Sequence, residues 1–158
     1  MNLFVEEHQM WLKAMLDAKV DFIVIGGYSV VFHGYRRTTG DMDIWLKPDN
    51  ANRDKLLPVL LNAGFDEDDV RYIGQIDFAE HFAFNIGDMP DKIDFLTRIN
   101  LITYDEADAQ KIMADVDGLQ VPFLHMNHLI LSKLNTGRAK DKADVEMLQK
   151  IANDKKEQ

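Results

Sequence analysis

The sequence contains no cysteine. This absence excludes a disulfide framework, a thiol nucleophile and a thiolate metal site. No hydrophobic run approaches the roughly 20 residues that a membrane-spanning helix needs. The amino terminus carries Glu6, Glu7 and His8 where a signal peptide would have a basic stretch followed by an apolar one. We therefore expect a cytoplasmic protein that does not engage a membrane.

Basic residues are also scarce, because 18 Lys and Arg stand against 27 Asp and Glu, and the net charge is −9. A protein that binds nucleic acid through a broad basic surface needs the opposite balance. A local basic groove remains possible near the carboxyl end, where four cations gather: Lys133, Arg138, Lys140 and Lys142. A solvated helix face would explain the same cluster.

Length and composition favour one globular domain. The chain has 158 residues, of which 46% are hydrophobic and 28% charged, which is ordinary for a globular protein. We expect a single domain over residues 1–152. The charged residues 153–158 are predicted to form a frayed tail.

The most informative stretch is residues 22–46. A short run of β-favouring residues reaches Gly26 and Gly27, and a segment without helix breakers then continues to Gly34. This pattern predicts a strand, a tight turn and a helix. Paired glycines allow a ligand to approach the backbone closely, and the N–H groups at the start of a helix attract phosphate. The glycine pair is therefore a candidate phosphate cradle.

Two acids follow on the next predicted strand. Asp41 and Asp43 are separated by one residue, so they project to the same side of that strand. Neighbouring carboxylates destabilise each other unless a cation lies between them. Carboxylate oxygens without Cys or His at ligand spacing favour Mg²⁺, or Mn²⁺, over zinc. An exposed strand face is the alternative explanation, and the glycine turn with the nearby Arg36 and Arg37 favours the metal site.

The rest of the chain alternates between helical and strand-like patterns. Helices are predicted at 3–19, where Trp11 should pack in the core, at 28–33, 50–64, 104–109, 127–134 and 139–151. Strands are predicted at 20–25, 71–76, 81–86, 92–97, Ile112–Val116 and Leu119–Phe123. Residues 65–70 are predicted to form an acidic loop.

These motifs, in this order, resemble the signature of the nucleotidyltransferase superfamily with the polymerase-β-like fold. The resemblance rests on Gly26-Gly27, His33-Gly34-Tyr35, Arg37-Thr38-Thr39-Gly40 and Asp41-x-Asp43. It is strongest to small stand-alone bacterial nucleotidyltransferases, a group that includes toxins of abortive-infection toxin–antitoxin systems. The resemblance implies an α+β (α/β) fold, in which helices flank a mixed β-sheet and a helix pair ends the domain.

The resemblance also assigns roles to individual residues. Asp94, a lone acid in an apolar strand, resembles the third catalytic carboxylate of the family, and with Asp41 and Asp43 it would bind the metal. The implied nucleotide contacts are Gly26, Gly27, Ser29, Arg37, Lys133 and Arg138. Asp141 and Asp144 would orient the basic residues or cap a helix.

The implied reaction moves a nucleoside monophosphate from a nucleoside triphosphate, such as ATP, to an acceptor hydroxyl and releases pyrophosphate. The acceptor is open: a toxin would modify RNA or a protein and have an antitoxin partner, whereas an antibiotic-type enzyme would modify a small molecule. A protein that binds a nucleotide or a partner without catalysis is a third alternative. An exposed aromatic such as Trp45, or a hydrophobic amino-terminal helix, could support a homodimer.

Overall fold

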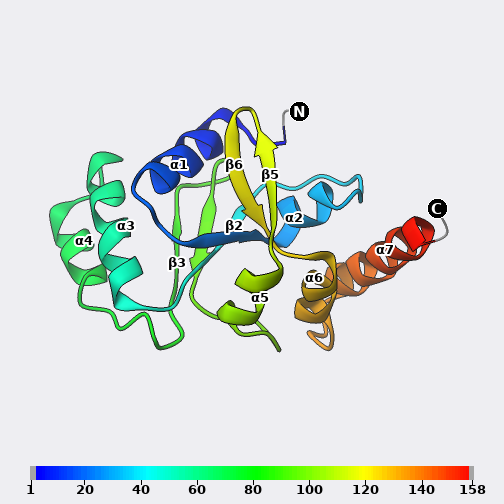
Figure 1. Cartoon of the computed structure of the whole chain (residues 1–158). Coiled ribbons are helices and arrows are strands. Elements are labelled where there is room, and N and C mark those ends of the chain that lie inside the picture. The colour runs from blue at the N-terminus through cyan, green and yellow to red at the C-terminus, as the bar shows by residue number, and fades with distance from the viewer. Residues whose placement is uncertain (1–2, 157–158) are drawn as a thin grey trace.

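The computed structural model describes residues 3–156, and within this range it contains seven helices and six strands (Figure 1). The helices are α1 (Glu6–Asp17), α2 (Gly26–Phe32), α3 (Asn50–Asn62), α4 (Glu67–Ile73), α5 (Tyr104–Gln110), α6 (Met126–Lys133) and α7 (Ala139–Lys156). The strands are β1 (Phe22–Ile25), β2 (Met42–Leu46), β3 (Ala83–Ile86), β4 (Ile93–Leu96), β5 (Ile112–Val116) and β6 (Leu119–Phe123).

All six strands form one mixed sheet in the order β3-β4-β2-β1-β6-β5. β2 runs parallel to β4 and antiparallel to β1, while β1 runs parallel to β6. The outer strands β3 and β5 each pair antiparallel with their inner neighbours. The α+β class and the mixed sheet flanked by helices are therefore confirmed.

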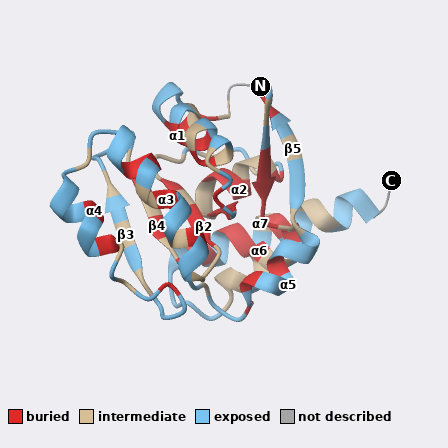
Figure 2. Ribbon diagram, turned by 60° about the vertical axis from the view of Figure 1, so that its left-hand side comes forward, coloured by how far each residue is buried: buried red, intermediate tan, exposed pale blue. Residues whose placement is uncertain are grey.

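Helices cover both faces of the sheet, and each face has its own hydrophobic layer. One layer joins the sheet to α1, α3 and α4, and the other joins it to α5, α6 and α7. β2 contributes to both layers because its side chains alternate: Ile44 belongs to the first and Trp45 to the second. Figure 2 shows the buried residues concentrated in the central strands and on the inward sides of the helices.

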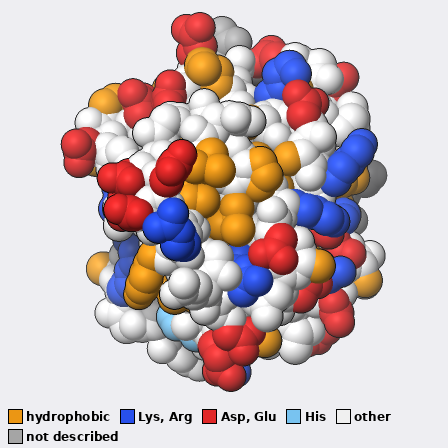
Figure 3. Space-filling view, turned by 90° about the vertical axis from the view of Figure 1, so that its left-hand side faces the viewer, with side chains coloured by type: hydrophobic (Ala, Val, Ile, Leu, Met, Phe, Trp, Pro, Cys, Tyr) orange, Lys and Arg blue, Asp and Glu red, His pale blue; other side chains and the backbone are white. Residues whose placement is uncertain are grey.

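Trp45 is only 1% exposed, so the idea that it could be an exposed dimer contact is wrong. The strand alternation that turns Ile44 toward α3 turns Trp45 beneath α5, where it meets Tyr104 edge to face at a centroid distance of 5.2 Å. Trp11 is buried as predicted. On the face that Figure 3 displays, hydrophobic side chains form a patch among acidic and basic groups. A dimer through the amino-terminal helix stays a prediction.

The segment after α3 corrects two predictions. Residues 65–70 are not a loop and residues 71–76 are not a strand, because α4 occupies Glu67–Ile73. Asp66 caps this helix by accepting a hydrogen bond from the Asp68 N–H, and the following acids favour a helix amino terminus. Val70 and Ile73, one helical turn apart, supply its buried side.

The predicted hairpin and the two closing helices are present. α7 continues to Lys156, so residues 153–156 of the predicted tail are helical in the structure, and residues 157–158 lie outside the described range. Fraying of this tail stays a prediction. In the described part of the chain, no helix has both the length and the hydropathy to cross a bilayer.

Candidate active site

The three predicted acids come together where β1 ends and where β2 and β4 begin. Asp43 is paired with Asp94 across the parallel β2–β4 ladder, so the two side chains leave the same face of the sheet. Asp41 immediately precedes β2. Burial, the charges of Asp94 and Asp41 and a hydrogen bond with Asp94 together raise the pKa of Asp43 to about 7.

A lysine that the sequence analysis missed lies among these acids. Lys92 Nζ is 3.7 Å from Asp41 Oδ2 and 3.5 Å from Asp94 Oδ1. It precedes Asp94 by two residues, so strand alternation could have placed it on the face of the acids. Its ammonium group offsets part of the repulsion between the carboxylates.

The donor set suits a hard divalent cation. It offers carboxylate oxygens only, and Asp41 Oδ1 is buried without a hydrogen-bond partner within residues 3–156. In that same range, no three His, Cys, Asp or Glu side chains are already gathered closely enough to hold a metal. The donor chemistry thus fits Mg²⁺ while the spacing is that of a site without metal, in which the Lys92 ammonium group lies between Asp41 and Asp94.

The glycine turn fits closely around the acids. Gly26 has a φ of +67°, which favours glycine, and a Cβ placed on it would lie 2.0 Å from Asp43 Oδ2. A Cβ on Gly27 would lie 2.2 Å from Thr39 Oγ1. The space that the missing side chains leave is used by neighbouring residues of the site. Phosphate binding by this turn stays a prediction.

The predicted cations are held by two buried acids of α7. Arg37 donates two hydrogen bonds of 3.0 Å to Asp144, which is 1% exposed. Lys133 Nζ is 3.0 Å from Asp144 Oδ2 and 3.1 Å from Asp141 Oδ1. Arg138 Nε is 3.6 Å from Asp141. These contacts give Asp141 and Asp144 the orienting position that the sequence analysis expected.

Asp141 is stabilised as an anion by its neighbours. Burial by itself would raise the pKa of this carboxyl. Hydrogen bonds from Thr136 and Lys133, with the positive charges of Lys133 and Arg138, outweigh the burial and lower the pKa below its usual range. The loop between α6 and α7 is therefore anchored by a charged carboxylate.

A pocket of about 340 Å³ collects most of the predicted site residues. Its lining includes six of them: Gly26, Gly27, Arg37, Asp43, Lys133 and Arg138. Asp41 and Asp94 stand beside Asp43 but outside this lining. Ser29 is fully buried and its hydroxyl has no partner among residues 3–156, so the structure does not bring it to the pocket. We call this space the cation pocket.

The cation pocket also contains polar residues that the sequence analysis passed over. Lys140, noted only as part of the basic cluster, lines it, and so do Thr136 and Arg98. Arg98 could have been found, because Asp94 and Arg98 are four residues apart and alternation directs both to one side of an extended chain.

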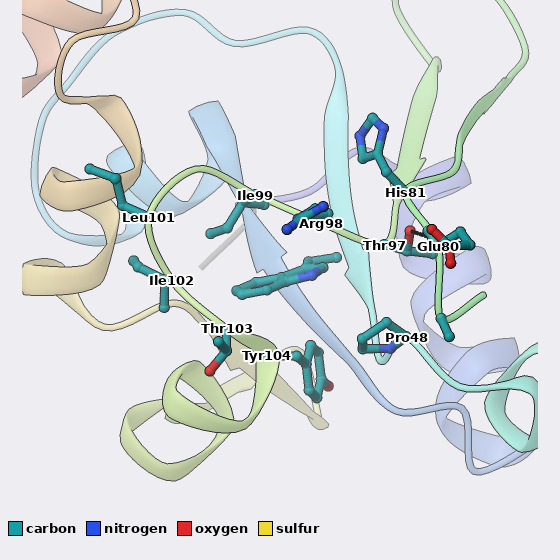
Figure 4. A pocket seen from close by; sticks show the side chains of 12 residues that line it. Pro48, Glu80, His81, Thr97, Arg98, Ile99, Leu101, Ile102, Thr103 and Tyr104 are labelled. Carbon is teal, nitrogen blue, oxygen red and sulfur yellow. Dashed lines mark hydrogen bonds between the residues drawn. The ribbon is translucent and has the colours of Figure 1, made fainter.

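A second pocket of about 420 Å³ adjoins the first and shares Arg98 and Ile99 with it. We call it the aromatic pocket, because Trp45 and Tyr104 lie in its wall. In Figure 4, Arg98 and Ile99 lie on one side of this pocket, and Tyr104 and Pro48 lie on the other. Its lining comes from three separate stretches, at 45–48, 79–81 and 97–104, so no local sequence pattern predicts it.

The sequence matches one family profile over residues 3–153, described as "Nucleotidyltransferase of unknown function (DUF6036)". No protein with a curated description matches. Several solved structures resemble the fold, and three of them follow. The lincomycin-bound lincosamide antibiotic adenylyltransferase LnuA has a TM-score of 0.56 and 18% identity, with 94% of this chain and 98% of that chain covered.

The second structure is a protein from Thermotoga maritima, provisionally described as a nucleotidyltransferase. It has a TM-score of 0.52 and 18% identity, with 93% of this chain and 91% of that chain covered. The third is an antigenic nucleotidyltransferase-like protein from Paracoccidioides brasiliensis, with a TM-score of 0.52, 12% identity and coverages of 92% and 74%. At these identities the likeness concerns the fold.

Proposed function

Because the chain belongs to the nucleotidyltransferase family DUF6036, we propose that it transfers a nucleoside monophosphate from a nucleoside triphosphate to an acceptor hydroxyl, with release of pyrophosphate. The observation that carries this proposal is the position of Asp43. Its carboxylate meets two further acids on one side and, on the other, lines a pocket with five cations: Arg37, Arg98, Lys133, Arg138 and Lys140. Acids for a metal and cations for phosphates are thus adjacent.

Asp41, Asp43 and Asp94 would hold Mg²⁺ or Mn²⁺. When bound, such a cation supplies a Lewis acid that stabilises negative charge on the transferring phosphate. Lys133 and Arg138 would neutralise the triphosphate, and Arg37 would hold the wall of the pocket through Asp144. Asp94 would accept the proton of the acceptor hydroxyl as a general base.

Two versions of this function differ in the acceptor, which is either a small molecule or an RNA or protein. The likeness in fold to a lincosamide adenylyltransferase supports a small-molecule acceptor, and so does the net charge of −9, which disfavours a long nucleic-acid interface. A toxin that modifies RNA or a protein, with an antitoxin partner, stays a prediction from the sequence resemblance. A protein that binds without catalysis would have no need for three converging acids.

The test is transfer of label from each α-labelled nucleoside triphosphate, with Mg²⁺, to RNA, protein extract or hydroxylated small molecules. The Asp41→Asn/Asp43→Asn variant should lose transfer while its circular dichroism stays unchanged. Asp154→Asn, at an exposed position of α7, is the matched control and should transfer normally. Full transfer by the double variant would refute the assigned catalytic acids, and absence of both transfer and nucleotide binding in the wild type would refute the function.

A further inference from the structure

We infer that the aromatic pocket receives the acceptor, and that this acceptor is a small hydroxylated molecule with an apolar face and a carboxylate, phosphate or carbonyl oxygen directed at Arg98. The inference rests on the proposed function and extends it to a second binding compartment. Its starting point is that the two pockets share Arg98 and Ile99. A molecule in one pocket therefore lies next to a molecule in the other.

The strand pattern puts both pockets over one face of the sheet. Asp43 and Trp45 are two residues apart on β2, so they project to the same face, and their partners on β4 are Asp94 and Leu96. Asp43 and Leu96 line the cation pocket, whereas Trp45 lines the aromatic pocket. The reacting acids and the aromatic wall thus follow one another along a single strand face.

The direction of the reaction favours the aromatic pocket for the acceptor. In an in-line displacement, the attacking oxygen and the leaving pyrophosphate stand on opposite sides of the phosphorus. The cations that would hold the pyrophosphate, Lys133 and Arg138, come from the α6–α7 side, next to the end of β1. β4 lies on the other side of β2, and residues directly after β4 line the aromatic pocket. An acceptor in the aromatic pocket would therefore attack from the side opposite the leaving pyrophosphate.

The lining describes the kind of molecule that would fit. Trp45, Ile102 and Tyr104 form a buried wall that combines aromatic and aliphatic surface. The volume of about 420 Å³ falls within the range of small-molecule sites. Arg98 is exposed and has neither a hydrogen bond nor an ion pair within the described residues, so its guanidinium is available to a ligand oxygen.

The wall of the aromatic pocket also contains two donors without hydrogen-bond partners. Trp45 Nε1 and Tyr104 Oη are buried and lack hydrogen-bond partners within residues 3–156. Burial raises the pKa of Tyr104, with smaller contributions from nearby acids led by Asp108, so its hydroxyl keeps its proton. Buried donors without acceptors are rare in proteins, so the hydrogen-bonding capacity of two polar atoms in this wall is unused within the described residues.

The same lining disfavours a polynucleotide acceptor. Affinity for a phosphate backbone requires several cations along its path. The aromatic pocket contributes Arg98 and the exposed His81, and the exposed Glu80 stands beside them. The geometry therefore selects a compact acceptor from the classes that the proposed function leaves open.

The decisive variant is Ala79→Trp, because Ala79 is exposed, lines the aromatic pocket and is not part of the cation pocket. Calorimetry would give the affinities of wild type and variant for ATP with Mg²⁺ and for inorganic tripolyphosphate. Transfer from labelled ATP would be measured to sugar phosphates, neutral glycosides and aminoglycosides, and to RNA and protein extract. Arg98→Gln is the second variant, with Arg71→Gln, at an exposed position of α4, as its matched control.

We expect Ala79→Trp to bind ATP and tripolyphosphate like the wild type and to lose transfer to small molecules. Arg98→Gln should raise the KM for the labelled small molecule by about tenfold or more, since a charged hydrogen bond is lost, and Arg71→Gln should not. Weakened ATP binding with unchanged tripolyphosphate binding in Ala79→Trp would overturn the inference, because the pocket would then hold the nucleoside.

Two other results would also overturn it. One is transfer to RNA or protein that Ala79→Trp leaves intact, and the other is a wild-type protein that binds ATP but labels no small molecule. A wild type that binds neither ATP nor tripolyphosphate would instead refute the proposed function itself.

Discussion

Among single residues, Gly26 shows most directly how the backbone makes room for the acids. We expect Gly26→Ala to abolish transfer, because the added Cβ would stand 2.0 Å from Asp43 Oδ2 and force that carboxylate to move. The φ of +67° adds backbone strain of about 1 kcal/mol for a residue with a side chain. Labelled-nucleotide transfer and thermal melting would be measured together.

Gly64→Ala is the matched control for this prediction. Gly64 also has a positive φ, +97°, but a Cβ there would meet nothing within 4 Å. The control should lose some stability through strain and keep full transfer. Equal activity of the two variants would show that the contact between Gly26 and Asp43 has no part in catalysis.

Asp43 makes the stability of the metal-free protein depend on pH. Its pKa is about 7 in the fold, against 3.8 for an ordinary aspartate, so the folded state holds the proton more tightly than the unfolded chain does. Stability is therefore lost as the pH rises from about 4 through about 7. In a chelator, melting temperatures should be higher at about pH 5.5 than at about pH 8.

Asp43→Asn should remove most of this decline, because asparagine carries no charge at either pH. The variant should therefore melt higher than the wild type at about pH 8, by roughly 2–4 °C for each kcal/mol of relieved repulsion. An identical decline in both proteins would show that another group causes the pH dependence.

At the scale of elements, Asp144 connects segments that are distant in the sequence. It accepts hydrogen bonds from Arg37, which follows α2, and lies 3.0 Å from Lys133 at the end of α6. We expect Asp144→Asn to destabilise the fold by about 3 kcal/mol, since two cations would lose a buried counter-charge. Nucleotide affinity should fall as well, because both cations line the cation pocket.

Urea unfolding and nucleotide titration would check the Asp144 prediction, with Asp154→Asn on the exposed part of α7 as the control. A variant that kept wild-type stability but bound nucleotide weakly would assign Asp144 to the site alone. Wild-type behaviour in both measurements would contradict the role of the network.

Elements with a clear local signal could be predicted from the sequence. The Asp117-Gly118 turn fixed the hairpin, and the apolar run before the glycine pair marked β1. α4 escapes prediction because its acidic first turn has the composition of a loop. The same acids indicate a helix and not a loop when Asp66 is taken as a cap, because acidic residues stabilise the amino end of a helix.

The site could be predicted only where local spacing determines geometry. Asp41 and Asp43 follow from strand alternation, whereas the pairing of Asp43 with Asp94 depends on the placement of β4 beside β2, which no local pattern determines. The resemblance to a family supplied that neighbour. Lys92 and Arg98 share the alternation of Asp94, but the ion pairs of Lys92 with the acids and the position of Arg98 between the two pockets depend on the tertiary structure.

Over the whole molecule, the excess of acid is distributed unevenly. The chain has a net charge of −9, yet the cation pocket carries five basic residues, namely Arg37, Arg98, Lys133, Arg138 and Lys140, against two acids in the same lining. On the proposed function, a triphosphate would therefore meet a locally positive site on an acidic protein. Metal and nucleotide should consequently bind as a unit, because the carboxylates repel a phosphate that arrives without a cation.

This coupling predicts a thermal response to ligands. ATP with Mg²⁺ at about 100 times its Kd should raise the melting temperature by roughly 5–10 °C, because a ligand at that concentration contributes about 2.7 kcal/mol. ATP with a chelator should raise it much less, and Asp41→Asn/Asp43→Asn should respond weakly to both mixtures. Since melting does not depend on an acceptor, the measurement is independent of the transfer reaction. A full shift in the chelator would show that the cations alone hold the nucleotide and that the three acids do not bind it through a metal.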